Sequence, residues 1–293
     1  MGMERAGKMR IYLMTDLEGV AGVRNFEEWT HPDARYYDTA RALLTEEVNA
    51  AVDGFFMGGA AAVLVADGHG PGAVDITRLD SRADLLRGWG RGWPLGLEED
   101  AFDAVAWVGQ HAKSRTPFSN MAHTQSCAYL EISVNGVAIG EFGQLAFCAG
   151  ERGIRAIFAA GELAFTREAS ALVPGIETVA VKRGTVPGRG DECTREQYAK
   201  RNHGAIHMHP ERARQRIREG ACRAIQRARG EEFGLLRLEP PYTRTVVMRA
   251  SREFPYPRWA VDAHPNSVAA LMNQPMRFQA VSAPGMLAKL LVD

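Results

Sequence analysis

The chain has 293 residues, of which 46% are hydrophobic, and its 35 basic and 35 acidic side chains give a formal charge of zero. A neutral chain lacks the excess of positive charge that favours nucleic acid or anionic lipid, so we expect a small partner, with no nucleic acid and no membrane. The length suffices for two ordinary domains of about 150 residues each.

The sequence predicts a cytoplasmic protein. It contains no apolar stretch of the roughly 20 residues that a membrane-spanning helix needs. Its first ten residues, MGMERAGKMR, lack the apolar segment of a secretory signal. The four cysteines are widely spaced and form no CxxC pair, which argues against a zinc ribbon and against a disulfide framework.

The first two thirds of the chain alternate between short apolar runs and helical patterns. The runs have strand length and are nearly continuous, as in strands covered on both faces; they lie at 10–15, 60–67, 104–109, 155–161 and 177–182. Between the first two, residues 37–57 carry apolar side chains at helical spacing and end at a glycine pair. The repetition predicts an α/β fold: an open, mostly parallel sheet with helices on both faces.

One segment interrupts this rhythm. Residues 129–143 contain Asn135-Gly136 between two apolar runs, which is a strong hairpin signal and predicts an antiparallel insert. A loop rich in Gly and Pro follows at 182–194, and its Arg189-Gly190-Asp191 tripeptide carries no functional information. We therefore predict a metal-binding catalytic α/β domain over residues 1–190.

The remaining residues, 191–293, are predicted to form a smaller α+β domain. Residues 209–229 form a helix with one apolar stripe, and its many arginines are interpreted as a solvated face because the whole chain is neutral. Strand-like runs follow at 244–250 and 276–281, and a helical pattern at 284–292 closes the chain.

Polar side chains of metal-ligand type follow three of the predicted strands. Asp16 and Glu18 follow the first strand, Asp67 and His69 the second, and His111 the third. Because ligands of an open parallel sheet bind beyond the carboxyl ends of its strands, these side chains predict a metal site at that edge. Mixed imidazoles and carboxylates suit zinc, manganese or cobalt.

Glu141, in the G-E-F-G that begins a new helix, is a fifth candidate ligand. Each residue also has a structural explanation: the acids cap turns or helix starts, and each histidine is a half-buried core residue. Asp67 either orients His69 or forms a turn. The ligand interpretation depends on the five residues gathering at one edge. The glycines beside Glu18 and His69 would let the backbone approach an ion closely.

Several short motifs occur in a recognisable order. They are T-D-L-E-G at 15–19, D-G-H at 67–69, G-Q-H-A at 109–112 leading through T-P to His123, and G-E-F-G at 140–143. In order and approximate spacing they resemble the D-aminopeptidase family of dinuclear zinc peptidases. The resemblance extends through A-A-G-E at 159–162 and V-A-V-K at 179–182, so that it covers residues 10 to about 185.

This resemblance implies a metal-dependent aminopeptidase that hydrolyses the N-terminal residue of short peptides, including D-amino acid peptides, through a water activated by two metal ions. Two zinc ions per subunit are implied, with manganese or cobalt as alternatives. The implied roles are a bridging ligand for Asp16, ligands of one ion for Glu18 and His69, ligands of the other ion for His111 and Glu141, and a catalytic group for His123. A ring-shaped homo-oligomer, a decamer in the family, is also implied.

Two other functions stay open from the residues alone. Lys113 and Arg115 near His111 would suit a two-metal phosphoesterase, because such enzymes place basic groups beside the phosphate. A non-catalytic, metal-stabilised binding protein is the second, and it would fill every coordination position with protein ligands. A cluster of His203, His207 and His209 is interpreted as surface imidazoles rather than an accessory metal site.

Overall fold

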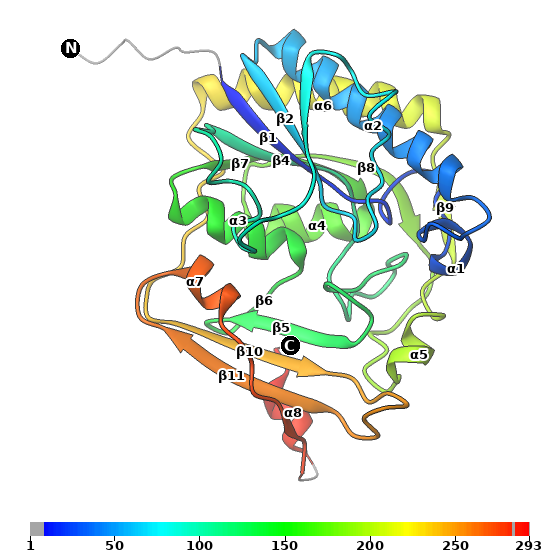
Figure 1. The fold of residues 1–293 in the computed structure, drawn as a ribbon, viewed down its shortest axis with the longest axis vertical. Helices are drawn as coiled ribbons and strands as arrows, with labels where there is room; N and C mark the ends of the chain where they lie inside the picture. The colour runs from blue at the N-terminus through cyan, green and yellow to red at the C-terminus, as the bar shows by residue number, and fades with distance from the viewer. Residues whose placement is uncertain (1–8, 283–284, 293) are drawn as a thin grey trace.

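The computed structural model describes residues 9–282 and 285–292. Residues 1–8, most of the ten-residue segment in which the sequence shows no secretory signal, lie outside the described residues. Residue 284, where the last predicted helix starts, also lies outside them. Two sheets organise the described chain (Figure 1). None of its described helices is long and apolar enough to cross a membrane.

The larger sheet has seven strands. Their order across the sheet is β3 (Ala83–Leu86), β2 (Ala62–Asp67), β1 (Arg10–Thr15), β4 (Ala104–Gln110), β7 (Arg155–Glu162), β8 (Glu177–Gly184) and β9 (Ala205–His207). Neighbouring strands run parallel except β9, which pairs antiparallel with β8 at the edge. The central strands are buried on both faces, which explains their continuous apolar sequences.

Helices cover both faces of this sheet. Figure 1 shows α2 (Tyr37–Gly58) and α6 (Pro210–Gly230) on one face, and α3 (Glu141–Glu151) and α4 (Leu163–Leu172) on the other. The apolar stripe of α6, which includes Ile217 and Ile225, is buried in the same core as Phe55 of α2. The arginine-rich face of α6 remains outside, as the sequence predicted.

The smaller sheet is antiparallel and packs against the outer side of α3. Its order is β12 (Gln279–Ala280), β11 (Arg258–His264), β10 (Tyr242–Met248), β5 (Tyr129–Val134) and β6 (Val137–Ala138). Phe147 and Cys148 of α3 share its core with Leu271 of α7 (Val268–Asn273). The remaining helices are α1 (Phe26–Trp29), α5 (Arg195–Tyr198) and α8 (Met286–Leu290).

The predicted fold class is confirmed, including the antiparallel hairpin, whose strands are β5 and β6. The sequence did not reveal β3 or β11, because both carry exposed and half-buried residues instead of a continuous apolar run. A division at residue 190 stays a prediction, and both sheets draw strands from both sides of it: β9 joins the larger sheet, while β5 and β6 pair with the later strands.

The strand order reverses direction at β1. Strand β1 lies between β2 and β4, so the chain passes to one side after β1 and returns to the other side for β4. In open α/β sheets such a switch point leaves a crevice beyond the carboxyl ends of the two strands. Asp16 immediately follows β1 and His111 immediately follows β4, so both residues lie at this crevice.

Candidate metal centre

Close backbone approach joins the carboxyl ends of β1 and β4. The amide of Asp16 donates to Val108 at 3.0 Å, and that of Gly19 donates to Gly109 at 2.6 Å. A Cβ on Gly19 would lie 2.0 Å from the carbonyl oxygen of Gln110, and one on Gly109 would lie 2.0 Å from that of Asp16. The glycine beside Glu18 therefore serves the contact between the two strand ends, a role different from the approach to an ion that the sequence suggested.

A first cluster joins the ends of β1 and β2. His69 Nδ1 lies 3.2 Å from Asp16 Oδ1 and 3.2 Å from Glu18 Oε2. All three side chains are buried, with at most 6% of any of these residues exposed. Their ligand atoms lie within 4.8 Å of one another, which is compact enough for one ion to contact all three.

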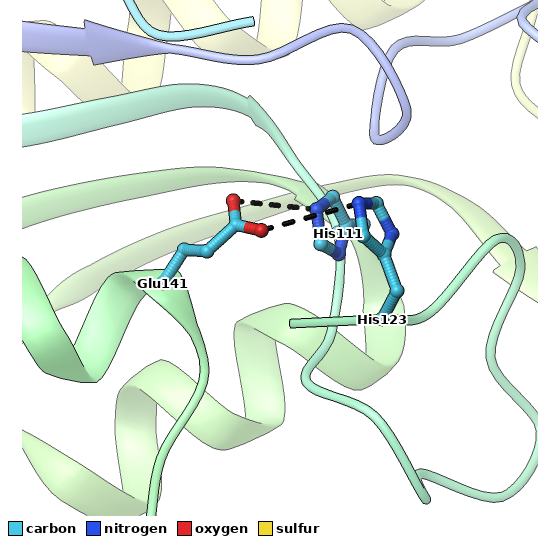
Figure 2. A group of neighbouring side chains, drawn as sticks. All are labelled: His111, His123 and Glu141. Carbon is cyan, nitrogen blue, oxygen red and sulfur yellow. Dashed lines mark ion pairs between the residues drawn. The ribbon is translucent and has the colours of Figure 1, made fainter. Parts of the chain in front are cut away.

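A second cluster joins the end of β4 to the start of α3. His111 Nε2 lies 3.5 Å from Glu141 Oε2, and His123 Nε2 lies 3.9 Å from Glu141 Oε1 (Figure 2). The two imidazoles stack, with their ring centroids 3.9 Å apart. His123 comes from the loop between β4 and β5, so this cluster combines a strand end, a loop and a helix start.

Asp16 faces both clusters with different oxygens. Its Oδ1 lies 3.2 Å from His69 Nδ1, and its Oδ2 lies 3.1 Å from His111 Nε2. Gln110 adds a second link, because its Nε2 donates to Asp16 Oδ2 at 3.0 Å and to Glu141 Oε2 at 3.1 Å. A carboxylate with one oxygen toward each of two ligand clusters has the arrangement of a bridging ligand.

Backbone carbonyls orient all three histidines. One ring nitrogen of each lies 2.9 Å from a carbonyl oxygen and so carries the proton: His69 Nε2 toward Thr30, His111 Nδ1 toward Ala112, and His123 Nδ1 toward Met121. The other nitrogen of each ring faces the carboxylates, where it can hold a second proton or, with a metal ion bound, offer its lone pair. Metal-binding histidines in proteins are commonly held in this way by an outer hydrogen bond.

The charges of the clusters favour a cation. Burial would raise the pKa of Asp16, but hydrogen bonds with His111 and His69 hold it well below its usual value. Burial would lower the pKa of His69, but the charges of Glu18 and Asp16 raise it to about 12. Burial likewise opposes the rise in the pKa of His111, which Glu141 and Asp16 hold well above the usual value. A divalent ion satisfies the same demand for positive charge.

His123 behaves differently. Burial lowers its pKa, and the charge of neighbouring His111 lowers it further, which keeps the ring neutral near pH 7. A neutral imidazole has a free lone pair at Nε2, so it can accept a proton or bind a metal. Its Nε2 is also the atom that faces Glu141, and the residue lines the cavity described below.

Two buried polar atoms test whether a metal fits this site. Glu18 Oε2 and His111 Nε2 are both buried and make no hydrogen bond of regular geometry, although each lies within ion-pair distance of a neighbour. Buried polar groups without a partner are rare, because each costs about 1–3 kcal/mol. Each cluster contains one such atom, and a metal ion in each cluster would satisfy it. The donor set of three carboxylates and three imidazoles fits zinc, manganese or cobalt.

The clusters open into a cavity of about 500 Å³. Asp16, Glu18, His69, His123 and Glu141 all line it, so the ligand-type atoms are accessible to a small molecule. The volume lies within the roughly 300–1,000 Å³ that is usual for small-molecule sites.

The structure brings together all five residues predicted as ligands, and His123 lies beside them; metal binding by them stays a prediction. Asp67 does not point to His69: its carboxylate accepts the amides of Ala73 and Val74 and so forms a turn. Among the described residues, the candidate ligand clusters are the two above, and the interpretation of His203, His207 and His209 as surface imidazoles stays a prediction.

The sequence did not single out Gln110 or Lys182. The buried Lys182 ammonium donates to the carbonyls of Glu18 and Val23, which fixes the loop after β1. Burial lowers the pKa of Lys182 to about 8. Gln110 directly precedes His111, and its position at a strand end was the one sign in the sequence that it belongs to the site. Amide side chains rarely bind zinc, so it was not counted among the ligands. Lys182 resembled an ordinary strand residue.

The chain is similar to known proteins. The family model described as D-aminopeptidase matches residues 9–254. The D-aminopeptidase of Bacillus subtilis strain 168 is 30% identical over 178 residues, or 60% of this chain, and the match spans 64% of that relative, which is less than two thirds. The solved structure of the Zn-dependent D-aminopeptidase DppA from Bacillus subtilis, described as a self-compartmentalizing protease, matches with a TM-score of 0.75 at 20% identity. That match covers 89% of this chain and 94% of the other.

Proposed function

The chain belongs to the D-aminopeptidase family, and from this membership we propose that it is a metal-dependent aminopeptidase that removes the N-terminal residue of short peptides. The observation that carries the proposal is the position of Asp16, whose two oxygens face two separate clusters at the floor of one cavity. Peptides with D-amino acids are the proposed substrates, since the curated relative is a D-aminopeptidase.

The proposed cofactor is a pair of zinc ions per subunit, for which manganese or cobalt could substitute. Asp16 would bridge the two ions, Glu18 and His69 would complete one site, and His111 and Glu141 the other. When bound, the ions would supply Lewis acidity, lowering the pKa of a water and polarising the scissile carbonyl. The zinc dependence of the solved relative supports this choice of metal.

His123 is the proposed proton carrier. Its ring is kept neutral by burial and by His111, and its Nδ1 proton is held by the carbonyl of Met121, so that Nε2 is free to accept a proton. The T-shaped contact with Phe26, with centroids 5.4 Å apart, limits rotation of the ring. His123 Nε2 would take a proton from the attacking water and return it to the leaving amine.

The catalytic clusters would also bind the free amine of the substrate. Two divalent ions outweigh the charge of the three carboxylates that line the cavity, so the N-terminal amine would bind in its neutral form, with its lone pair toward an ion. Loss of that lone pair, as in an N-acetylated peptide, should therefore weaken hydrolysis. This dependence distinguishes an aminopeptidase from an endopeptidase.

The test of the function is hydrolysis of paired L- and D-alanyl dipeptides by purified protein whose metal content is measured in parallel. We expect hydrolysis that disappears on chelation and returns with zinc. Absence of hydrolysis in zinc-loaded protein would contradict the proposal. A chromogenic phosphodiester provides the counter-assay for the phosphoesterase alternative.

The phosphoesterase alternative is not favoured. Its basic residues, Lys113 and Arg115, do not belong to the cavity lining. Arg115 is buried elsewhere and pairs with Asp191 at 2.8 Å and with Glu131, so its charge is already compensated. The non-catalytic alternative is not favoured either, since the ligand-type atoms line an open cavity.

We further propose a ring-shaped homo-oligomer, with ten subunits as the expected number, in the cytoplasm. The description of the solved relative as self-compartmentalizing supports an enclosing assembly. The four cysteines are free thiols, which fits a reducing compartment. Light scattering coupled to size exclusion should give a mass near ten times the 32.1 kDa of one chain, and a monomeric mass would contradict the ring.

A further inference from the structure

The cavity beside the two clusters has a pronounced apolar wall. Three tryptophans line it, and aliphatic side chains complete the surface; the wall comprises Trp89, Trp93, Trp107, Met14, Leu95 and Leu145. This set is called the tryptophan wall below. Trp107 is fully buried, whereas Trp89 and Trp93 are half-buried. Covering such a surface with an apolar group of a ligand is favourable, because it removes apolar area from water.

The loop that supplies Trp89, Trp93 and Leu95 of the wall is held from two sides. The hydroxyl of Tyr12 in β1 donates to the carbonyl of Leu95. Asn273, the last residue of α7, accepts the amide of Trp93 at 2.9 Å and donates to its carbonyl at 2.8 Å. The wall is therefore built into the fold, and a ligand that packs against it need not order the loop first.

The carboxylate floor adjoins this wall. Glu141 and Leu145 both line the cavity and lie one helical turn apart on α3, so their side chains occupy the same face of the helix. A peptide whose N-terminal amine lies at the clusters would thus place the side chain of its first residue near Leu145 and the tryptophans.

Among the described residues, Arg195 of α5 is the only lysine or arginine that lines the cavity. The residue is exposed. Arg195 comes from α5, whereas the tryptophan wall comes from other elements, among them α3, which Figure 1 shows apart from α5. The cavity is therefore lined by an apolar set of side chains, by a basic side chain from a different element and by the carboxylate clusters, and this combination matches a short peptide with a free carboxylate.

We propose that the cavity selects dipeptides with a large apolar N-terminal side chain, which packs against the tryptophan wall while the C-terminal carboxylate binds Arg195. The proposal rests on the aminopeptidase function above and specifies its substrate class. An aromatic or branched aliphatic first residue covers the wall, whereas alanine leaves it exposed to water. An amide at the C-terminus removes the charge that Arg195 would bind.

The substrate test compares Phe-Ala, Ala-Ala and Phe-Ala-amide in matched D and L configurations with the zinc-loaded protein. We expect kcat/KM for Phe-Ala to exceed that for Ala-Ala about tenfold or more, which is the effect of burying one large apolar side chain. The amide should be hydrolysed about five- to tenfold less well than the acid, the effect of one charge-assisted contact at an exposed residue. Equal values for Phe-Ala and Ala-Ala would overturn the proposal, as would equal values for acid and amide.

Variants locate the two contacts. Trp89→Ala should reduce kcat/KM for Phe-Ala to about that for Ala-Ala, and Arg195→Ala should abolish the difference between acid and amide. Tyr256→Ala and Lys200→Ala are the controls, because both residues are exposed and neither lines the cavity. A control variant that changed these ratios as much as its partner would contradict the assignment.

Binding separates this proposal from the aminopeptidase function. Dissociation constants for the same peptides can be measured by calorimetry with His123→Ala protein, which should hydrolyse them about 10²- to 10⁴-fold more slowly than the wild type. Tighter binding of Phe-Ala than of Ala-Ala, lost in the double variant with Trp89→Ala, would support the wall even if no peptide were hydrolysed. Hydrolysis without any difference in affinity or kcat/KM between the two peptides would overturn the wall and leave the function intact.

Discussion

Replacing Asp16 by asparagine should remove metal from both clusters at once. Asp16 Oδ1 lies 3.2 Å from His69 Nδ1 and Oδ2 lies 3.1 Å from His111 Nε2, so each oxygen serves a different cluster. Asparagine keeps the shape but replaces one oxygen by an NH₂ group, which cannot bind a cation. It also removes one of the three carboxylates that face the two clusters.

The size of the effect follows from burial. Only 6% of Asp16 is exposed, so water cannot replace the missing charge. Removing one partner of a buried charge pair costs about 3–5 kcal/mol, which corresponds to an increase in Kd of about 150- to 5,000-fold. At a zinc concentration 100 times the wild-type Kd, the variant would lose about 2.7 kcal/mol of metal-linked stability for each site.

The assay is equilibrium dialysis against buffered zinc, followed by elemental analysis per folded subunit. Wild-type protein should retain two zinc ions, Glu18→Gln should lose one, and Asp16→Asn should lose both. Asp67→Asn is the matched control, because this buried carboxylate ends the neighbouring strand but binds the backbone amides of Ala73 and Val74.

Retention of one tightly bound zinc ion in Asp16→Asn would refute the bridging role, since an unshared carboxylate can cost only its own site. Loss of zinc from Asp67→Asn to the same extent would show that any buried charge change at this edge disrupts the site. Unfolding temperatures measured with and without zinc provide the independent check, because a variant that binds no zinc should show no stabilisation by it.

Three further outcomes are expected. His123→Ala should keep its zinc while turnover falls about 10²- to 10⁴-fold; loss of an ion in elemental analysis would instead make His123 a ligand. Burial raises the pKa of Glu47 from 4.5 to about 8. The protonated Glu47 side chain therefore contributes fully to stability below pH 4.5. This contribution is lost as the pH rises to 8, at up to about 1.4 kcal/mol per pH unit. Glu47→Gln should flatten this decline in urea unfolding at pH 5 to 8, and equal slopes in both proteins would contradict it. Arg115→Ala leaves Glu131 buried without its partner and should destabilise the fold by about 3 kcal/mol in the same assay, with no loss of zinc.

The fold class was predictable because burial on both faces leaves a direct mark on the sequence. Strands such as β1 and β4 are continuous apolar runs, and the polar residues that follow them stand out by contrast. Edge and surface strands such as β3 and β11 carry mixed residues, which local patterning cannot separate from loops. The packing of α6 beside α2 joins segments about 170 residues apart, and the helical pattern of α6 does not indicate which element it packs against.

The candidate site divides in the same way. The sequence by itself determined the types of ligand residue and their positions after strands, since parallel strands bring their carboxyl ends to one edge. Only the tertiary structure decided that Asp16 faces both clusters and that Arg115, beside the site in sequence, points away to Asp191. The tryptophan wall likewise depends on Asn273 of α7. The physical reason is that side-chain direction and distant hydrogen bonds are set by packing between elements, which no local pattern encodes.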